Sequence, residues 1–225
     1  MKLALFDLDH TLLSGDSDAL WCEFLLGRGL LDAQTFAACN AQMAQGYREG
    51  SVTPQAFCEF YVSTLAGLSR TQAEPLRQAF LNEAVLPRIP ASARALVEQH
   101  RTQGDTLLLT TATNRFLTEL TARHLGIEHV IATEAEEVQG RFSGRTRGTL
   151  NMREGKVVRL REWLLQQGLD QACLARATFY SDSINDLPLL RAVGSPVAVD
   201  PDSQLAAHAQ ALGWRVLRLA PHPTH

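Results

Sequence analysis

Four aspartates follow two of the apolar runs in this chain of 225 residues. Asp7 and Asp9 come at the end of the first run, and Asp182 and Asp186 follow a later one. If the two runs are parallel strands, the carboxylates meet in one pocket, where they repel each other unless their pKa values rise or a cation binds. Such hard oxygen ligands favour Mg²⁺. Because a carboxylate beside this ion can attack phosphorus, the residues predict a magnesium-dependent phosphoryl-transfer site.

Two further side chains could bind a phosphate group. Thr111 follows another apolar run, where its hydroxyl and the neighbouring backbone N–H groups can donate to a phosphate oxygen. Lys156 brings a positive charge to the start of a predicted helix, although a lysine there is unfavourable against the helix dipole. We take both as catalytic and substrate-binding candidates. The alternatives are a capping threonine and a solvated lysine.

Apolar runs and amphipathic segments alternate along most of the chain. The runs predict strands at residues 3–8, 106–110, 177–180, 196–199 and 214–217. Helical spacing is found in residues 91–103, 115–124 and 156–167, each closing near a glycine. The alternation predicts an α/β fold with a doubly wound parallel sheet and ligands at the carboxyl ends of its strands. Residues 131–150 predict a hairpin around Gly140 and Gly144.

Residues 14–88 break this alternation. They separate the first strand from the next helix by far more than the roughly 2–6 residues of an ordinary βα loop. Within them, apolar residues recur at helical spacing in residues 18–28, 32–48, 54–66 and 71–82. We therefore predict two domains, an α/β catalytic core made of residues 1–13 and 89–225 and a helical cap domain made of residues 14–88.

The composition narrows the class of protein. A net charge of −3 and a pI near 6.2 offer no basic surface for nucleic acid. No apolar stretch reaches the roughly 18 residues of a membrane span, and the N-terminus is too acidic for a secretory signal. The four cysteines form no metal-binding or disulfide pattern. We expect a cytoplasmic protein with free thiols and a small-molecule partner, and the sequence leaves its oligomeric state open.

In their order along the chain, these residues resemble the four motifs of the haloacid dehalogenase superfamily. Its D-x-D-x-T motif is similar to Asp-Leu-Asp-His-Thr at residues 7–11, and its acidic motif to Ser-Asp-Ser-Ile-Asn-Asp at residues 181–186. Thr111 and Lys156 match the threonine and lysine motifs. The resemblance covers almost the whole chain. The helical insertion and Glu-Gly-Lys at residues 154–156 are similar to the phosphoserine phosphatase branch, subfamily IB.

The resemblance implies a role for each aspartate. Asp7 would attack phosphorus in line, while Asp9 would protonate the leaving alkoxide and then deprotonate the attacking water. The Asp7 carboxylate, the Asp9 backbone carbonyl and the Asp182 carboxylate would hold Mg²⁺, with Asp186 as a nearby acidic support. Since an alkoxide leaves poorly unless it is protonated, a phosphatase gains from a general acid such as Asp9.

The cap is expected to select the substrate. Asp16, seven residues after Asp9, stands where phosphoserine phosphatases carry a glutamate that meets the substrate's amino group. It is equally a candidate N-cap of the first cap helix. The shorter Asp16 side chain, and Thr113 in place of the branch's usual glycine, favour a variant substrate as much as phosphoserine. Arg48 is one of several candidates for binding a substrate carboxylate. The resemblance thus implies phosphoserine or an amino-alcohol phosphate such as histidinol phosphate.

Two other functions fit part of the pattern. Receiver domains of signalling proteins also combine an aspartate cluster, a strand-end threonine and a lysine on a doubly wound sheet. They place the acidic pair and the phospho-accepting aspartate on different strands and lack a large cap, so they are the weaker alternative. A phosphotransferase or mutase on the same scaffold would pass the phosphoryl group to an alcohol instead of water.

Overall fold

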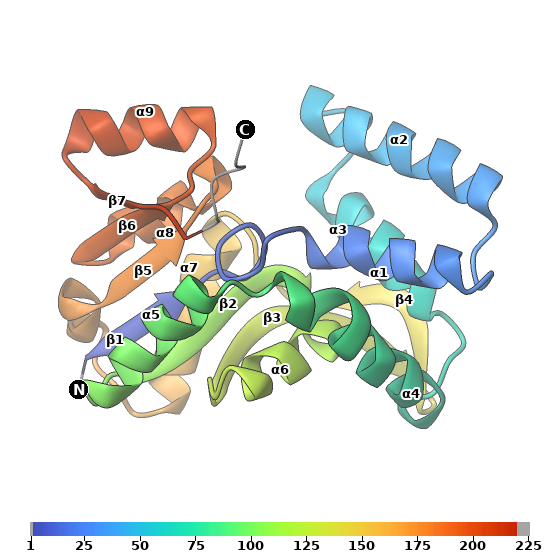
Figure 1. Cartoon of the computed structure of the whole chain (residues 1–225), viewed down its shortest axis with the longest axis horizontal. Helices are drawn as coiled ribbons and strands as arrows, with labels where there is room; N and C mark the ends of the chain where they lie inside the picture. The colour runs from blue at the N-terminus through green and yellow to red at the C-terminus, as the bar shows by residue number, and fades with distance from the viewer. Residues whose placement is uncertain (1, 220–225) are drawn as a thin grey trace.

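Seven strands form one sheet in the computed structural model, which describes residues 2–219 apart from the side chains of Ala44 and Arg48. The strands are β1 (Leu3–Phe6), β2 (Thr106–Asn114), β3 (His129–Val138), β4 (Arg141–Arg147), β5 (Thr178–Ser181), β6 (Ser195–Val199) and β7 (Arg215–Leu217). Their order is β4-β3-β2-β1-β5-β6-β7 (Figure 1). β4 runs antiparallel to β3, and the other neighbours are parallel.

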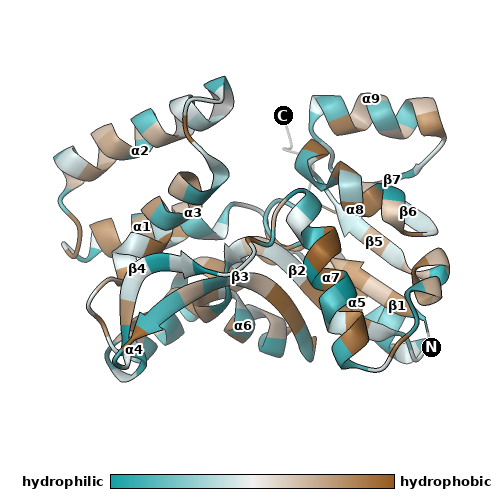
Figure 2. Ribbon diagram, turned by 180° about the vertical axis from the view of Figure 1, so that it is seen from behind, coloured by the Kyte–Doolittle hydropathy of each residue, from teal (hydrophilic) through white to brown (hydrophobic). Residues whose placement is uncertain are grey.

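Helices cover both faces of this sheet, which confirms the doubly wound α/β fold. They are α5 (Ala91–Thr102), α6 (Arg115–His124), α7 (Glu154–Gln166), α8 (Leu187–Ala192) and α9 (Ser203–Leu212). Successive strand residues point to opposite faces. Ala4 and Phe6 of β1 therefore pack in one buried cluster with α5 and α6, while Leu3 and Leu5 pack in a second cluster with α7, α8 and α9. Figure 2 shows hydrophobic and hydrophilic residues alternating along α7 and α9, as expected for helices with one buried side.

Most predicted elements lie within a few residues of the observed ones. The range of α6 is the predicted one, and the predicted hairpin is confirmed as β3 and β4. Gln139 and Gly140 connect these strands with φ angles of 51° and 75°, which fit a type I′ turn. β2 continues past its predicted end because its threonines suit an extended backbone, and it ends where the Asn114 side chain caps α6. The short helices α8 and α9 have no counterpart among the predicted elements.

Helices fill the chain between β1 and α5. They are α1 (Ser17–Gly27), α2 (Ala33–Glu49), α3 (Pro54–Val62) and α4 (Arg70–Phe80). The short 3-10 helix η1 (Ser63–Leu65) follows α3, and the π-helix η2 (Leu81–Val85) and the 3-10 helix η3 (Leu86–Arg88) follow α4. In Figure 1, α1, α2 and α3 lie together beyond one end of β1, and α4 lies near α6 and β4. We keep the name cap for residues 14–88, whose status as a separate domain stays a prediction.

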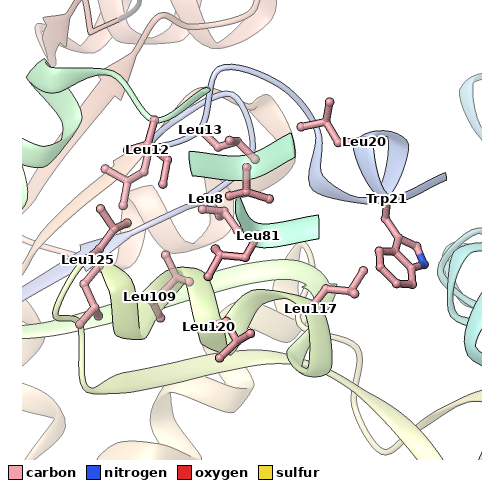
Figure 3. Close-up of a cluster of buried hydrophobic side chains, with 14 of the residues drawn as sticks. Leu8, Leu12, Leu13, Leu20, Trp21, Leu81, Leu109, Leu117, Leu120 and Leu125 are labelled. Carbon is pink, nitrogen blue, oxygen red and sulfur yellow. The ribbon is translucent and has the colours of Figure 1, made fainter. Parts of the chain in front are cut away.

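The cap and the sheet share one hydrophobic cluster. Figure 3 shows Leu20 and Trp21 of α1 in the same buried cluster as Leu8, which follows β1, and Leu117 of α6. Trp21 is 1% exposed, and its indole nitrogen donates to Thr64 Oγ1 at 2.9 Å. Burial of a large apolar side chain contributes about 1.5–3 kcal/mol. The shared cluster holds α1 against the sheet, with its first residues beside the strand ends, and the Thr64 contact joins Trp21 to the rest of the cap.

Two expectations from composition concern membranes and thiols. Within residues 2–219, no helix has the length and apolar content that crossing a membrane requires.

All four cysteines are unpaired, as predicted. Burial raises the pKa of the Cys58 thiol to about 12, and the nearby Asp18 and Glu59 carboxylates act in the same direction. This thiol is therefore uncharged at neutral pH and a poor nucleophile.

Candidate active site

The carboxyl ends of β1 and β5 lie side by side. The two strands are parallel, with Phe6 opposite Tyr180, and the Asp7 N–H donates to the Tyr180 carbonyl at 2.9 Å. Asp7 follows β1 and Asp182 follows β5 directly, so both lie at the carboxyl ends of these neighbouring strands. Aspartates far apart in the sequence are thus brought together, as expected from their positions after two strands.

Lys156 lies between two of the predicted carboxylates. Its ammonium donates to Asp7 Oδ1 at 2.8 Å and to Asp186 Oδ2 at 2.6 Å, and its side chain is 3% exposed. Burial by itself would lower the pKa of this ammonium, but the Asp186 and Asp7 carboxylates reverse the effect and raise it. Lys156 is therefore a charged, buried residue, and the solvated alternative is wrong. Ser181 Oγ also donates to Asp186 Oδ2, at 2.7 Å, so Asp186 holds the lysine, and its support of a metal ion stays a prediction.

The first turn of α7 and the loop before it are shaped to deliver Lys156. Gly155 lies so close to the Leu150 carbonyl that a Cβ would come within 2.0 Å of its oxygen, which requires glycine at this position. The buried Asn151 side chain fastens the same loop to the sheet, because its Nδ2 donates to the Thr111 carbonyl at 2.9 Å. Sequence reasoning missed Asn151, since an asparagine outside a motif gives no signal of its partners.

Several negative charges crowd around Asp7. Burial raises the pKa of the Asp7 carboxyl well above its ordinary value, and the Lys156 ammonium offsets part of this rise. The carboxylates of Asp186, Asp182 and Asp9 raise it further. A divalent cation would relieve this crowding, because its charge offsets the mutual repulsion of the carboxylates.

The residues at the strand ends fit a magnesium ion. The carboxylates of Asp7 and Asp182 and the backbone carbonyl of Asp9 would supply hard oxygen donors, which Mg²⁺ prefers. No group of three acidic, histidine or cysteine side chains within residues 2–219 is arranged to hold a metal ion by itself.

Thr11 fixes the position of Asp182. The Thr11 hydroxyl donates to Asp182 Oδ1 at 3.0 Å and accepts from the Asp182 N–H at 3.1 Å. Burial raises the pKa of Asp182 to about 6, and the hydrogen bond from Thr11 acts against this rise. The two hydrogen bonds restrict the rotation of the Asp182 carboxylate. They also give the threonine of the first motif a structural role.

Removal of divalent cations is expected to lower the melting temperature strongly at pH 7.5 and little at pH 5. Because the pKa of Asp182 is raised to about 6 and that of Asp7 is also raised, the folded state binds more protons than the unfolded state between about pH 4 and pH 6. Stability of the metal-free protein therefore falls as pH rises through that window. Mg²⁺ is expected to bind the ionised carboxylates and thereby to restore the lost stability.

Differential scanning fluorimetry with Mg²⁺ or with EDTA measures this effect. At a hundredfold excess over Kd, binding adds about 2.7 kcal/mol, which corresponds to roughly 5–10 °C for a protein of this size. Equal shifts at the two pH values would show that the cation does not bind these carboxylates.

The Asp9 carboxyl accepts hydrogen bonds from the cap and from the sheet. Ser17 donates to Asp9 Oδ1 through its N–H at 2.7 Å and through its hydroxyl at 2.5 Å. Thr113 Oγ1 lies 2.9 Å from Asp9 Oδ2, and Thr111 Oγ1 lies 3.4 Å from the same oxygen. Burial raises the pKa of Asp9 to about 6, the Asp16 carboxylate adds to this, and the hydrogen bonds lower it. A carboxyl group that titrates close to neutrality can both give and take a proton.

Asp16 acts as the N-cap of α1, which is one of the two alternatives that the sequence left open. Its Oδ1 accepts from the Ala19 N–H at 2.8 Å. A contact between Asp16 and the substrate stays a prediction. The other cap candidate, Arg48, has a side chain that lies outside the described residues.

Asp18, one position further into α1 than Ser17, was not predicted as a site residue. Its Oδ2 lies 3.3 Å from Thr113 Oγ1, and its Oδ1 is buried with no hydrogen-bond partner in the described part of the chain. Burial, followed by the Asp16 and Asp9 carboxylates, raises the pKa of Asp18 well above its ordinary value. A sequence pattern could not identify Asp18, because the direction of its side chain depends on how α1 packs.

Known proteins resemble this chain over most of its length. The profile of the haloacid dehalogenase-like hydrolases matches residues 4–191. A Neisseria meningitidis protein named histidinol-phosphatase is 39% identical over 217 residues, covering 96% of this chain and 98% of that protein. A solved structure of a Bordetella pertussis protein of unknown function matches with a TM-score of 0.93 at 41% identity, covering 97% of this chain and 99% of that one. The structure described as a phospho-aspartyl intermediate analogue of phosphoserine phosphatase shares the fold, with a TM-score of 0.67 at 16% identity. The match covers 97% of this chain and 93% of that one.

Proposed function

The chain belongs to the haloacid dehalogenase-like hydrolases and is a phosphatase, and from this premise we propose that it hydrolyses a small phosphomonoester through an aspartyl phosphate on Asp7, with Mg²⁺ as cofactor. The observation that carries the proposal is the buried Asp7 carboxylate, which pairs with the Lys156 ammonium at 2.8 Å at the edge where Asp182 also lies. A fixed carboxylate among charges that can neutralise a phosphoryl group suits attack on phosphorus.

The proposed reaction has two steps. An oxygen of Asp7 attacks phosphorus, the bond between phosphorus and the ester oxygen breaks, and Asp9 gives its proton to the departing alkoxide. Asp9 then takes a proton from water, which attacks the aspartyl phosphate and releases inorganic phosphate and a regenerated Asp7. Lys156 and Thr111 would bind oxygens of the phosphoryl group. A bound Mg²⁺ supplies further neutralisation of phosphoryl charge.

We propose an amino-alcohol phosphate as the substrate, with histidinol phosphate as the first compound to test. Asp9, Asp16 and Asp18 bring three carboxyl groups to the start of α1, and Asp16 raises the pKa of both others. The unpartnered Asp18 Oδ1 offers a ready acceptor to a cationic N–H group of a substrate. The name of the Neisseria relative, histidinol-phosphatase, supports the same choice.

A direct assay tests this proposal. The purified protein is supplied with Mg²⁺ and, in separate reactions, with histidinol phosphate, phosphoserine, glycerol phosphate and p-nitrophenyl phosphate, and phosphate release is measured. We expect hydrolysis of the chromogenic ester and the highest kcat/KM with an amino-alcohol phosphate. No phosphate release from any ester, with a long-lived phosphoprotein formed from acetyl phosphate, would favour a signalling domain. Transfer of phosphate to an added alcohol would favour a phosphotransferase.

Asp18→Asn is expected to raise KM for histidinol phosphate about tenfold, and to leave KM for glycerol phosphate almost unchanged. The amide keeps the size of the side chain but removes the negative charge, and a charge-assisted hydrogen bond of about 1.4 kcal/mol corresponds to a factor of ten. Asp16→Asn is the comparison variant, because Asp16 is the other candidate for this contact and asparagine caps a helix as well as aspartate does. If Asp16→Asn raised KM and Asp18→Asn did not, the amino group would contact Asp16.

A further inference from the structure

The general acid proposed above is held by residues that none of its sequence motifs contains. Asp9 follows β1, but its carboxyl accepts hydrogen bonds from Ser17, the first residue of the cap helix α1, and from Thr113 near the end of β2. We propose that Ser17 and Thr113 are positioning residues, which hold the Asp9 carboxyl in the orientation from which it protonates the leaving group. This inference rests on the proposed phosphatase reaction at Asp7.

Ser17 fixes one oxygen of the carboxyl. Its backbone N–H and its hydroxyl both donate to Asp9 Oδ1, at 2.7 and 2.5 Å, and the residue is 2% exposed. The N–H is free to do so because Ser17 is the first residue of α1, where backbone donors lack partners within the helix. Asp16 uses the Ala19 N–H instead, so the two acids share the donors at this helix end without competing. The positive end of the helix dipole also favours a carboxylate here.

Thr113 fixes the other oxygen. Its hydroxyl lies 2.9 Å from Asp9 Oδ2 and 3.3 Å from Asp18 Oδ2, and its own Oγ1 is 3.1 Å from the Ser17 hydroxyl. A threonine hydroxyl has a single proton to donate, and the shorter contact is the one with Asp9. With Oδ1 held by Ser17, Oδ2 is directed toward Thr111, the predicted phosphate-binding residue at 3.4 Å.

The hydrogen bonds that Ser17 and Thr113 donate to Asp9 join two parts of the fold. Ser17 belongs to the cap, whereas Asp9 and Thr113 belong to the core, so the orientation of the carboxyl depends on where α1 lies. The hydrophobic cluster that contains Leu20 and Trp21 of α1 also contains Leu8 of the core, and this shared packing keeps the start of α1 in place. The alternative is a purely structural role, in which the two hydroxyls provide hydrogen bonds to a buried carboxyl group and have no effect on proton donation.

Leaving-group dependence separates these roles. Ser17→Ala and Thr113→Val each remove one hydroxyl with little change in volume. For phenyl phosphate, whose leaving group needs protonation, we expect kcat/KM to fall about 10- to 100-fold, a part of the 10²–10⁴ that a general acid supplies. For p-nitrophenyl phosphate, whose leaving group departs as a stable anion, we expect a fall within about threefold. The value of kcat/KM depends only on the steps up to departure of the alcohol. Later hydrolysis of the phosphoenzyme therefore does not affect it.

Three variants complete the experiment. Thr113→Ser and Ser17→Thr retain a hydroxyl and are expected to keep most of the wild-type ratio between the two esters. Thr53→Ala removes an exposed N-cap hydroxyl from the cap helix α3, where it accepts from the Ala56 N–H, and it should leave the ratio unchanged. Should Thr113→Val fail to fold, Ser17→Ala carries the test, because the Ser17 N–H contact survives in it.

The outcomes distinguish this inference from the proposed function. A wild-type protein that hydrolyses neither ester would overturn the proposed function. A wild-type protein that hydrolyses both, with Ser17→Ala and Thr113→Val losing equal factors on each ester or none on either, would overturn the positioning roles alone. A selective loss on phenyl phosphate that Thr113→Ser and Ser17→Thr avoid would establish them.

Discussion

Asp7→Asn is expected to lower kcat/KM for every phosphomonoester by at least about a thousandfold, the scale on which loss of a nucleophile acts in other hydrolases. The amide has the shape of the carboxylate but lacks the nucleophilic oxygen anion, so attack on phosphorus is lost. Lys156 keeps its contact with Asp186 Oδ2 at 2.6 Å, which limits the structural damage. Initial rates of phosphate release with saturating Mg²⁺ give the comparison.

The same substitution at another buried aspartate is the matched control. The Asp105 side chain is 5% exposed and pairs with His100 at the opposite end of the sheet from the candidate site, so Asp105→Asn should keep kcat/KM within about threefold of the wild type. Wild-type protein quenched in acid during turnover should carry a phosphoryl group that hydroxylamine releases, and Asp7→Asn should carry none. Wild-type turnover no faster than that of Asp7→Asn would falsify the assignment.

Lys156→Met is expected to reduce both turnover and stability. The substitution removes the ammonium that would bind the phosphoryl group, and it leaves Asp7 and Asp186 buried side by side without their common partner. Breaking a buried pair by removing one partner costs about 3–5 kcal/mol. We expect a loss of that size in the free energy of unfolding, measured by urea denaturation at pH 7.5 without metal, and a loss of at least about a hundredfold in kcat/KM.

Arg161→Met provides the control for this prediction. Arg161 is an exposed cation on the same helix, α7, so its removal should change the free energy of unfolding by no more than about 0.5 kcal/mol. Lys156→Met combined with Asp186→Asn should regain part of the lost stability, because one of the unpaired carboxylates is gone. A single Lys156→Met variant as stable as Arg161→Met would mean that the buried pair contributes nothing.

The main elements of the fold were readable from local patterns. Apolar runs of strand length alternating with helical periodicity indicated a doubly wound sheet, and the long interval at residues 14–88 indicated an inserted helical unit. What local patterns did not indicate is the order β4-β3-β2-β1-β5-β6-β7 and the sharing of one hydrophobic cluster by cap and sheet. Trp21 illustrates the difference, because the helical spacing of residues 18–28 predicted a helix but not that Trp21 would join a buried cluster that also contains Leu8.

The candidate site divides in the same way. Asp7, Asp9, Asp182 and Lys156 were found because each stands at an element boundary where chemistry is possible, and the structure brings their side chains together. Ser17 and Thr113 were missed as partners of Asp9, although Thr113 was noted as unusual, and Asp18 was missed as a neighbour of Thr113. Asp16 was singled out by spacing alone, and its observed contact is a helix cap.

The sequence by itself determined which groups can carry the reaction, because an aspartate that follows an apolar strand must lie at the carboxyl edge of the sheet. Only the tertiary structure decided which groups orient them. Ser17 and Thr113 are 96 residues apart, and their meeting over Asp9 depends on how α1 packs against the sheet. A hydrogen bond of that kind is set by the placement of whole elements, which no periodicity or spacing within either segment encodes.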